Sequence, residues 1–277
     1  MHNILFIYIS LKDSQIRQKD LESQLAKLKN DIKDIKIDYC MFNAINGKKL
    51  PKEYVQILDL RRQLSNICSH SLGPSEFGCL LSHLMIWQKL VNGDYKHYSR
   101  IVILEDDVIL NYNHIEKKLK HILDSKPDFA FLGGHNATAR RRIRGYSHPN
   151  QLCFNLAGPK DLYTGAFAYT LTPSTAEHFI YKQTKSLTYL DDWTYLLKNK
   201  LTVPFYYCFD HNYELESSIV PDRDLYMKKP NRFKKNYTKI KNDIISRIIS
   251  LFLFKNITRL STFTMSEKNK LQTFDKL

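Results

Sequence analysis

The sequence predicts an α/β protein whose central sheet is mostly parallel, built as one large domain with a C-terminal extension. The first observation is the continuous apolar run at residues 3–9, NILFIYI, which is typical of a strand buried on both faces. The second is the order of the later segments, because strand-like runs alternate with stretches of helical periodicity. This alternation indicates βα units and a parallel sheet.

Composition narrows the class of protein further. The 277 residues are 43% hydrophobic and include 17 Tyr and 15 Phe, which excludes a disordered chain. Lys and Arg number 42 against 28 Asp and Glu, and the formal charge of +14 predicts a polyanionic partner. That partner is nucleic acid, an anionic membrane, or a phosphorylated or acidic substrate.

The compartment is predicted from what the sequence lacks. No apolar run is long enough to span a bilayer, and the N-terminus lacks the basic region and cleavage site of a signal peptide. The five cysteines are scattered, without a CxxC pair. We therefore expect a cytosolic protein with reduced thiols, either soluble or lying on a surface.

The N-terminal half is predicted to continue as helix, strand and helix. The first helical repeat consists of Leu21, Leu25, Leu28, Ile32 and Ile35. A strand is expected over residues 37–42, closed by the turn signal Asn46-Gly47. The next helix has Ser75 as its expected N-cap. Its apolar stripe consists of Phe77, Leu80, Leu81, Leu84, Trp87 and Val91.

The C-terminal half repeats the alternation. Strands are expected at residues 100–104, 129–132, 162–172 and 202–209. Helices are expected at residues 114–124, 173–183 and 191–200. Residues 133–160 contain few apolar runs and are predicted to be a long loop or insertion.

The composition changes after Pro221. Residues 223–277 combine clustered Lys and Arg with an apolar stripe of period four, Ile240, Ile244, Ile248 and Phe252. We expect a basic amphipathic helical extension to a domain of residues 1–222. Such a helix suits the surface of an anionic membrane, and the alternative is that it packs on the domain or on a second copy of the chain.

Three consecutive carboxylates, Glu105, Asp106 and Asp107, follow the apolar run at residues 100–104. Glu105 and Asp107 point the same way if the strand continues through them. At the carboxyl end of a buried strand they lie where open α/β sheets bind ligands, and their oxygens suit Mg²⁺ or Mn²⁺ bridging a nucleotide diphosphate. The competing interpretation is an acidic, solvated strand end.

Several motifs accompany the carboxylates. GPSEFGCLLSHLMIW, at residues 73–87, precedes VILEDDV, at residues 102–108, and the chain also contains ILFIYISL, FNAINGKKL, TGAFAYTLTPSTAEHF, LDDW and ESSIV. In residue type and order these motifs resemble glycosyltransferase family 25, the lipooligosaccharide or lipopolysaccharide core glycosyltransferases. The resemblance runs to about residue 222. It implies a GT-A-like catalytic domain, a UDP-sugar donor such as UDP-galactose, a divalent metal and inversion at the anomeric carbon.

The resemblance also implies roles for individual residues. Asp107 is expected to coordinate the metal directly, and Glu105 and Asp106 through water or by holding the ribose. His83 and Arg17 are expected at the donor. Apart from the resemblance, His211 lies in CFDHN at the end of a predicted strand and is expected as an additional metal ligand. The alternative for His83 is a buried structural histidine.

An inverting transfer needs a base, for which Asp191 and Asp192 are the candidates, with Asp192 preferred on the resemblance. Both also suit the N-cap of a helix. Trp193 either stacks on a sugar or belongs to the core. The basic loop residues Arg140, Arg141, Arg142 and Arg144 are either solvated or bind anionic groups of the acceptor.

The predicted function is β-galactosyl transfer onto a lipooligosaccharide core acceptor at the cytosolic face of the inner membrane, with the tail on the anionic surface. UDP-glucose and UDP-N-acetylhexosamine remain alternative donors. A nucleic-acid-binding protein is the alternative suggested by charge, but no recognition motif supports it. A third possibility keeps the fold without the chemistry. The oligomeric state is not predicted.

Overall fold

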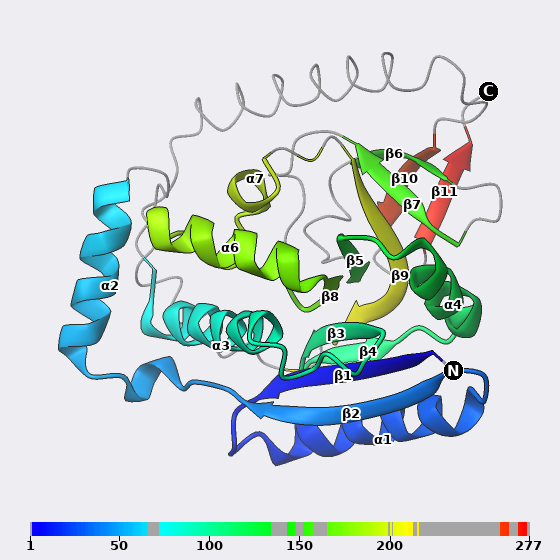
Figure 1. Ribbon diagram of the computed structural model, residues 1–277, viewed down its shortest axis with the longest axis horizontal. Coiled ribbons are helices and arrows are strands. Elements are labelled where there is room, and N and C mark those ends of the chain that lie inside the picture. The colour runs from blue at the N-terminus through cyan, green and yellow to red at the C-terminus, as the bar shows by residue number, and fades with distance from the viewer. Residues whose placement is uncertain are drawn as a thin grey trace.

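The computed structural model has one mixed sheet with helices on both faces (Figure 1). It describes residues 2–65, 72–133, 143–147, 152–157, 165–198, 200, 202–212, 215, 261–265 and 271–275. Within these residues the sheet has 11 strands.

The central part of the sheet is mostly parallel, as predicted. Its strands are β1 (Asn3–Ser10), β2 (Lys36–Asn43), β3 (Arg100–Glu105), β5 (Phe129–Gly133), β8 (Ala168–Leu171) and β9 (Thr202–His211), in the order β9-β5-β8-β3-β1-β2. β1 is parallel to β2 and β3, β5 is parallel to β9, and β8 is antiparallel to both neighbours. Every central strand except β8 therefore ends at the same edge of the sheet.

Short antiparallel strands extend the sheet beyond β9. They are β7 (Phe154–Ala157), β6 (Ile143–Ser147), β10 (Ser261–Met265) and β11 (Leu271–Asp275), and β4 (Val108–Leu110) pairs with the end of β9. The prediction of a loop throughout residues 133–160 is wrong at β6 and β7. Their sequences, IRGYS and FNLA, lack the longer apolar run that marks β5 and β8 in the sequence.

The helices lie on the two faces of the sheet. α1 (Gln15–Asp31) and α4 (Ile115–Ser125) share one apolar core, whereas α3 (Pro74–Val91), α6 (Pro173–Lys185) and α7 (Trp193–Leu196) share the other. The side chains of β1 alternate between these cores: Ile4, Phe6 and Tyr8 enter the first, and Leu5, Ile7 and Ile9 the second. The apolar run at residues 3–9 is thus buried on both faces.

Two helix starts differ from the prediction. α3 begins at Pro74 with Gly73 as its N-cap, not Ser75, and Glu76 accepts a hydrogen bond from the Gly73 amide at 3.0 Å. Proline is well suited to the first helical position because that position has no intrahelical donor to lose. α7 covers only Trp193–Leu196 of the helix predicted over residues 191–200.

The C-terminal extension is described only in part. β10 and β11 belong to the sheet, although the sequence predicts a helical extension there. Residues 216–260, which include the apolar stripe and most of the basic residues, lie outside the described residues, so the boundary at residue 222 stays a prediction. In the parts that are described, no helix combines the length and apolarity needed to cross a membrane.

Two glycines hold α3 against the segment that follows β2. A Cβ atom on Gly78 would lie 2.5 Å from the backbone nitrogen of Gly47 and 2.5 Å from the carbonyl oxygen of Ile45. A Cβ atom on Gly47 would lie 1.7 Å from the carbonyl oxygen of Pro74. The Ile45 amide also donates to Ser82 Oγ at 2.9 Å. This contact joins two of the motifs that resemble the family, FNAINGKKL and GPSEFGCLLSH.

We expect Gly78→Ala to lower the free energy of unfolding by about 1–3 kcal/mol, because the methyl group would collide with backbone that cannot rotate away. Alanine is favoured over glycine inside a helix by about 1 kcal/mol. A net decrease in the free energy of unfolding would therefore come from the collision and not from helix propensity. Urea unfolding measures the effect. Met85→Ala on the same helix is the control, since Met85 is 48% exposed. Unchanged stability of Gly78→Ala would contradict the close contact.

Candidate active site

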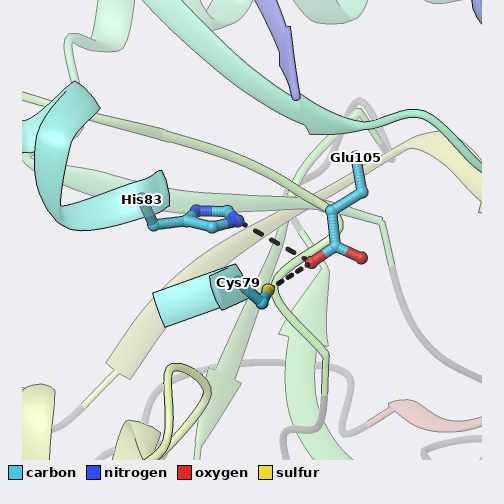
Figure 2. Close-up of side chains that lie close together, drawn as sticks. All are labelled: Cys79, His83 and Glu105. Carbon is cyan, nitrogen blue, oxygen red and sulfur yellow. Dashed lines mark hydrogen bonds and ion pairs between the residues drawn. The ribbon is translucent and has the colours of Figure 1, made fainter. Parts of the chain in front are cut away.

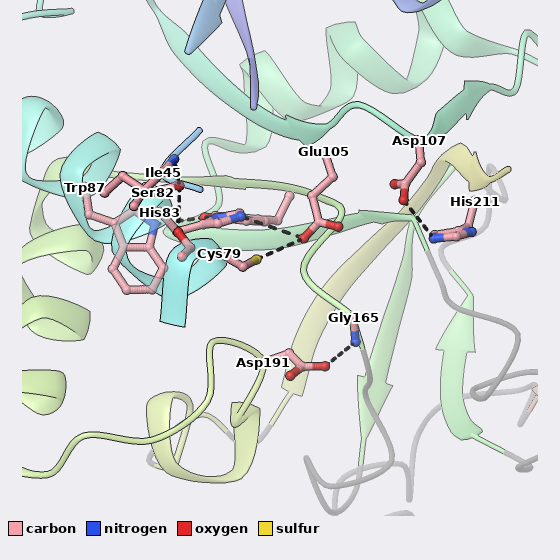
Figure 3. A network of polar contacts seen from close by, with 12 residues as sticks. Ile45, Cys79, Ser82, His83, Trp87, Glu105, Asp107, Gly165, Asp191 and His211 are labelled. Atoms are coloured by element: carbon pink, nitrogen blue, oxygen red, sulfur yellow. Dashed lines mark hydrogen bonds and ion pairs between the residues drawn. The ribbon is translucent and has the colours of Figure 1, made fainter. Parts of the chain in front are cut away.

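The three carboxylates at the end of β3 have different sets of partners. Figure 3 shows two of them, with Glu105 directed at Cys79 and His83 and Asp107 directed at His211. β3 ends at Glu105, and Asp106 and Asp107 form a turn before β4 reverses the chain. Because β1, β3 and β9 end at the same edge, Ser10, Glu105 and His211 all lie at carboxyl ends of strands. This is the edge at which open α/β sheets bind ligands.

Asp106 is held by the end of β1 and the start of α1. Ser10 Oγ donates to Asp106 Oδ2 at 2.6 Å, and Arg17 Nη1 lies 3.2 Å from Asp106 Oδ1. Burial raises the pKa of Asp106, and the Ser10 hydrogen bond and the Arg17 charge oppose that rise. Arg17 Nη1 also lies 3.6 Å from Asp107 Oδ2, so one guanidinium offsets two of the three charges.

Asp107 is 9% exposed and faces the end of β9. His211 Nε2 lies 3.3 Å from Asp107 Oδ2, and the Asn212 amide donates to the Asp107 carbonyl oxygen at 2.7 Å. Burial lowers the pKa of His211, but the adjacent Asp107 carboxylate outweighs burial and raises the pKa above its ordinary value. Asp107 Oδ1 is buried and has no hydrogen-bond partner among the described residues.

Glu105 turns away from Asp107 toward α3. His83 Nε2 lies 3.7 Å from Glu105 Oε1, and Cys79 Sγ lies 3.8 Å from the same oxygen (Figure 2). Burial, and then the negative charge of Asp107, raise the pKa of Glu105 well above its ordinary value.

His83 is 0% exposed and lies behind Glu105. Its Nδ1 is 2.7 Å from the Tyr169 hydroxyl, which also accepts a hydrogen bond from Trp87 Nε1 at 2.9 Å. Burial lowers the pKa of His83 to about 3, so the imidazole is neutral at physiological pH. This placement favours the structural alternative for His83 over contact with a donor phosphate.

The second pair of candidate carboxylates lies between the end of α6 and α7. Asp191 is half-buried, and its Oδ2 accepts a hydrogen bond from the Gly165 amide at 2.7 Å. Gly165 has φ +86°, a conformation that favours glycine. Asp191 is close enough for its charge to contribute to the raised pKa of Glu105.

Asp192 has the capping role that the sequence allowed. Its Oδ1 accepts a hydrogen bond from the Tyr195 amide at 3.1 Å, at the N-cap of α7, and it is 7% exposed. Burial raises the pKa of Asp192. Trp193 is 0% exposed and packs against Phe129 and Phe131, so it belongs to the core.

The structure adds residues that the sequence did not single out. Ser10, Cys79 and Tyr169 contact the predicted site residues directly. For Cys79 the sequence did contain a signal: Cys79 and His83 are four residues apart, which puts both side chains on one face of a helix. Arg140, Arg141 and Arg142, and the side chain of Arg144, lie outside the described residues, as does the segment ESSIV.

Comparison with known proteins identifies the family. The profile of glycosyltransferase family 25 (LPS biosynthesis protein) matches residues 2–195, which is more than half of the chain. The match includes residues 105–107 and 191–192 and ends before His211. A search of curated proteins finds no match. The chain belongs to glycosyltransferase family 25 and is a glycosyltransferase of LPS biosynthesis.

Proposed function

We propose that the protein is a metal-dependent, inverting glycosyltransferase that moves galactose from UDP-galactose onto a lipooligosaccharide core sugar. The observation that carries the metal dependence is Oδ1 of Asp107, which is buried at the carboxyl edge of the sheet and has no hydrogen-bond partner among the described residues. A buried carboxylate oxygen without a donor is costly, and a divalent cation would satisfy it. The choice of galactose rests on the family resemblance alone, and glucose and N-acetylhexosamine remain the alternatives.

The residues around Asp107 fit a divalent metal. Asp107 supplies a carboxylate oxygen, and His211 lies beside it as the second candidate ligand. Glu105 is the third, if its side chain rotates away from α3. Mn²⁺ or Mg²⁺ bound there supplies positive charge that stabilises the departing UDP. Arg17 holds Asp106 and Asp107 in place and offsets their repulsion.

Transfer with inversion requires a base on the acceptor side of the sugar. The acceptor hydroxyl oxygen attacks the anomeric carbon, its proton passes to a carboxylate, and the bond to UDP breaks with its electron pair on the phosphate oxygen. The resemblance favours Asp192, but its cap bond and its burial indicate a structural role. Asp191 is half-buried and close enough to Glu105 for its charge to raise the Glu105 pKa, and these features favour Asp191 as the base.

The alternatives of another class have less support. A nucleic-acid-binding role rests on the charge of +14, which an anionic membrane and a phosphorylated donor explain equally well. Loss of chemistry with retention of the fold is disfavoured because carboxylates occupy both residues 105–107 and residues 191–192.

We expect Asp107→Asn to lower the transfer rate on the order of 10²–10⁴-fold, because the variant loses the charge that binds the metal. The assay uses a panel of UDP-sugars with truncated core oligosaccharides and determines the product linkage. EDTA should abolish transfer by the wild type, and Mn²⁺ should restore it. Asp106→Asn is the matched comparison and should be milder, since Ser10 and Arg17 already hold both oxygens of Asp106. Full activity in EDTA would refute metal dependence.

The two candidate bases can be separated by matched amide variants. Asn also caps helices well, so Asp192→Asn should keep the hydrogen bond to the Tyr195 amide and remain within about tenfold of wild-type turnover. Asp191→Asn should lower turnover by about 10²–10⁴-fold with little change in donor KM, because a base acts in the transition state. Steady-state kinetics with thermal melts measures both. The reverse order would assign the base to Asp192.

Peripheral attachment to an anionic membrane gains support from α2 (Lys52–Ser65). Tyr54, Ile57, Leu60 and Leu64 are 64%, 64%, 56% and 75% exposed, which leaves an apolar stripe along this helix. Lys48, Lys49 and Lys52 are exposed at its N-terminal end. Apolar side chains flanked by cations favour binding at the headgroup level of a bilayer, where each basic residue contributes roughly 1 kcal/mol.

We expect Ile57→Glu combined with Leu64→Glu to lower cosedimentation with phosphatidylglycerol vesicles by at least about tenfold, while transfer to a water-soluble acceptor is kept. Point changes are preferable to removing the tail, because β10 and β11 pair with the sheet. Ile16→Glu is the control, since Ile16 is 82% exposed on α1. If the double variant binds vesicles normally, or if sedimentation velocity shows that it instead abolishes a dimer, α2 is not the membrane contact.

A further inference from the structure

Behind the acidic turn, three side chains with different donor atoms converge. Cys79 and His83 lie one helical turn apart on α3 and point toward Glu105 at the end of β3 (Figure 2). The sulfur, the imidazole nitrogen and the carboxylate oxygen all lie within 4.8 Å of one another. One soft, one intermediate and one hard donor therefore face a common point.

A second observation indicates that this point suits a cation. His83 Nε2 is buried, has no hydrogen-bond partner among the described residues, and is directed at the cluster. At 3.7 Å from Glu105 Oε1 it is too far for a hydrogen bond but close enough to share a ligand. The charges of Glu105, Asp191 and Asp107, which together with burial raise the pKa of Cys79, also give the cluster a negative potential.

Two of the three separations between the donor atoms are close to those of a tetrahedral zinc site. Zn²⁺ binds sulfur at about 2.3 Å and nitrogen or oxygen at about 2.0–2.2 Å, so its ligand atoms lie roughly 3.3–3.6 Å apart. The Cys79–Glu105 and His83–Glu105 distances, 3.8 and 3.7 Å, approach this range. His83 Nδ1 faces the Tyr169 hydroxyl at 2.7 Å, and ligating histidines usually have such a partner on the second ring nitrogen.

We propose that Cys79, His83 and Glu105 form a binding site for a thiophilic divalent cation of the Zn²⁺ class, and that an ion held there inhibits sugar transfer. On binding, the Cys79 thiol releases its proton to solvent and its sulfur donates an electron pair to the ion. The three protein ligands leave the fourth coordination position of the ion to water, which can reach it because Glu105 is only half-buried. Inhibition rests on the proposed function, because the bound ion would keep the Glu105 carboxylate against α3 and away from the donor.

This site differs in chemistry from the one around Asp107. Thiolate ligands select Zn²⁺ and Co²⁺ over Mn²⁺ and Mg²⁺, whereas carboxylate ligands suit Mn²⁺ and Mg²⁺. Glu105 thus belongs to both donor sets. Cys79 distinguishes the two sets, because it belongs only to the one that contains His83.

The test is a titration of the metal-free, full-length protein with Co²⁺, in the presence of a reductant that is not a thiol. We expect one equivalent to give a near-ultraviolet thiolate-to-cobalt charge-transfer band, which Zn²⁺ displaces. Cys79→Ser should lose the band and Cys40→Ser should keep it, since Cys40 is an exposed free cysteine elsewhere. Glu105→Gln should raise the Kd for Co²⁺ at least about tenfold. A thermal melt of each variant verifies folding.

No band, or a band that survives Cys79→Ser and disappears in Cys40→Ser, would overturn the site. A second measurement tests inhibition separately: in excess Mn²⁺, Zn²⁺ should inhibit transfer by the wild type and not by Cys79→Ser. Equal inhibition of both proteins would overturn the inhibitory role. The charge-transfer band needs no sugar transfer, so failure of the proposed function would show as a band without activity.

Discussion

The structure depends on accommodating three consecutive carboxylates at the carboxyl end of one buried strand. Glu105, Asp106 and Asp107 would repel one another and lose hydration there. Their repulsion is relieved because the turn after β3 sends each side chain in a different direction. Asp106 meets Ser10 and Arg17, Asp107 meets Arg17 and His211, and Glu105 faces α3.

The carboxylates therefore link distant parts of the chain. Their partners come from β1, α1, α3 and β9, so the site exists only when these elements have assembled. The close contact between Gly47 and Gly78 also contributes to assembling the site, because it sets the position of α3 and therefore of Cys79 and His83. These partners do not fully offset the cost of burying the carboxylates, because burial still raises the pKa of Glu105 and Asp106. Such residual cost in the free protein is typical of a site that binds a cation.

Elements with a continuous or periodic apolar pattern are predictable from the sequence, and elements without such a pattern are not. The run at residues 3–9 and the repeat of Leu21, Leu25 and Leu28 have enough periods to identify β1 and α1. β6 and β7 escape detection because pairing, and not a pattern of their own, makes them strands: β7 pairs with β9, and β6 pairs with β7. Ser75 is a plausible cap by residue type, but Pro74 already fits the first helical position and moves the cap to Gly73.

The candidate site is also predictable only in part, because some of its features depend on neighbouring residues and others on residues far away in the chain. The acidic triplet is local, so its position at a strand end follows from the sequence. Its partners are not local: 96 residues separate Ser10 from Asp106, and 89 separate Arg17 from Asp106. The resemblance implies that His83 contacts the donor, yet its complete burial behind Glu105 depends on how α3 packs on the sheet.

Glu105 has two possible sets of neighbours, and this choice bears on metal selectivity. If its side chain turns toward Asp107, Glu105 joins Asp107 and His211 in a set of mostly hard donors. If it turns toward α3, Glu105 joins His83 and the thiol of Cys79. Late first-row ions bind most donor sets more tightly than Mn²⁺ or Mg²⁺ does, so the abundance of the ion, and not affinity alone, decides which set is filled. The fully buried imidazole of His83 is held by the Tyr169 hydroxyl, to which Trp87 Nε1 also donates, and this makes the second set rigid on the side of α3. If both proposals hold, rotation of the Glu105 side chain distinguishes the proposed metal site for a diphosphate from the proposed zinc site.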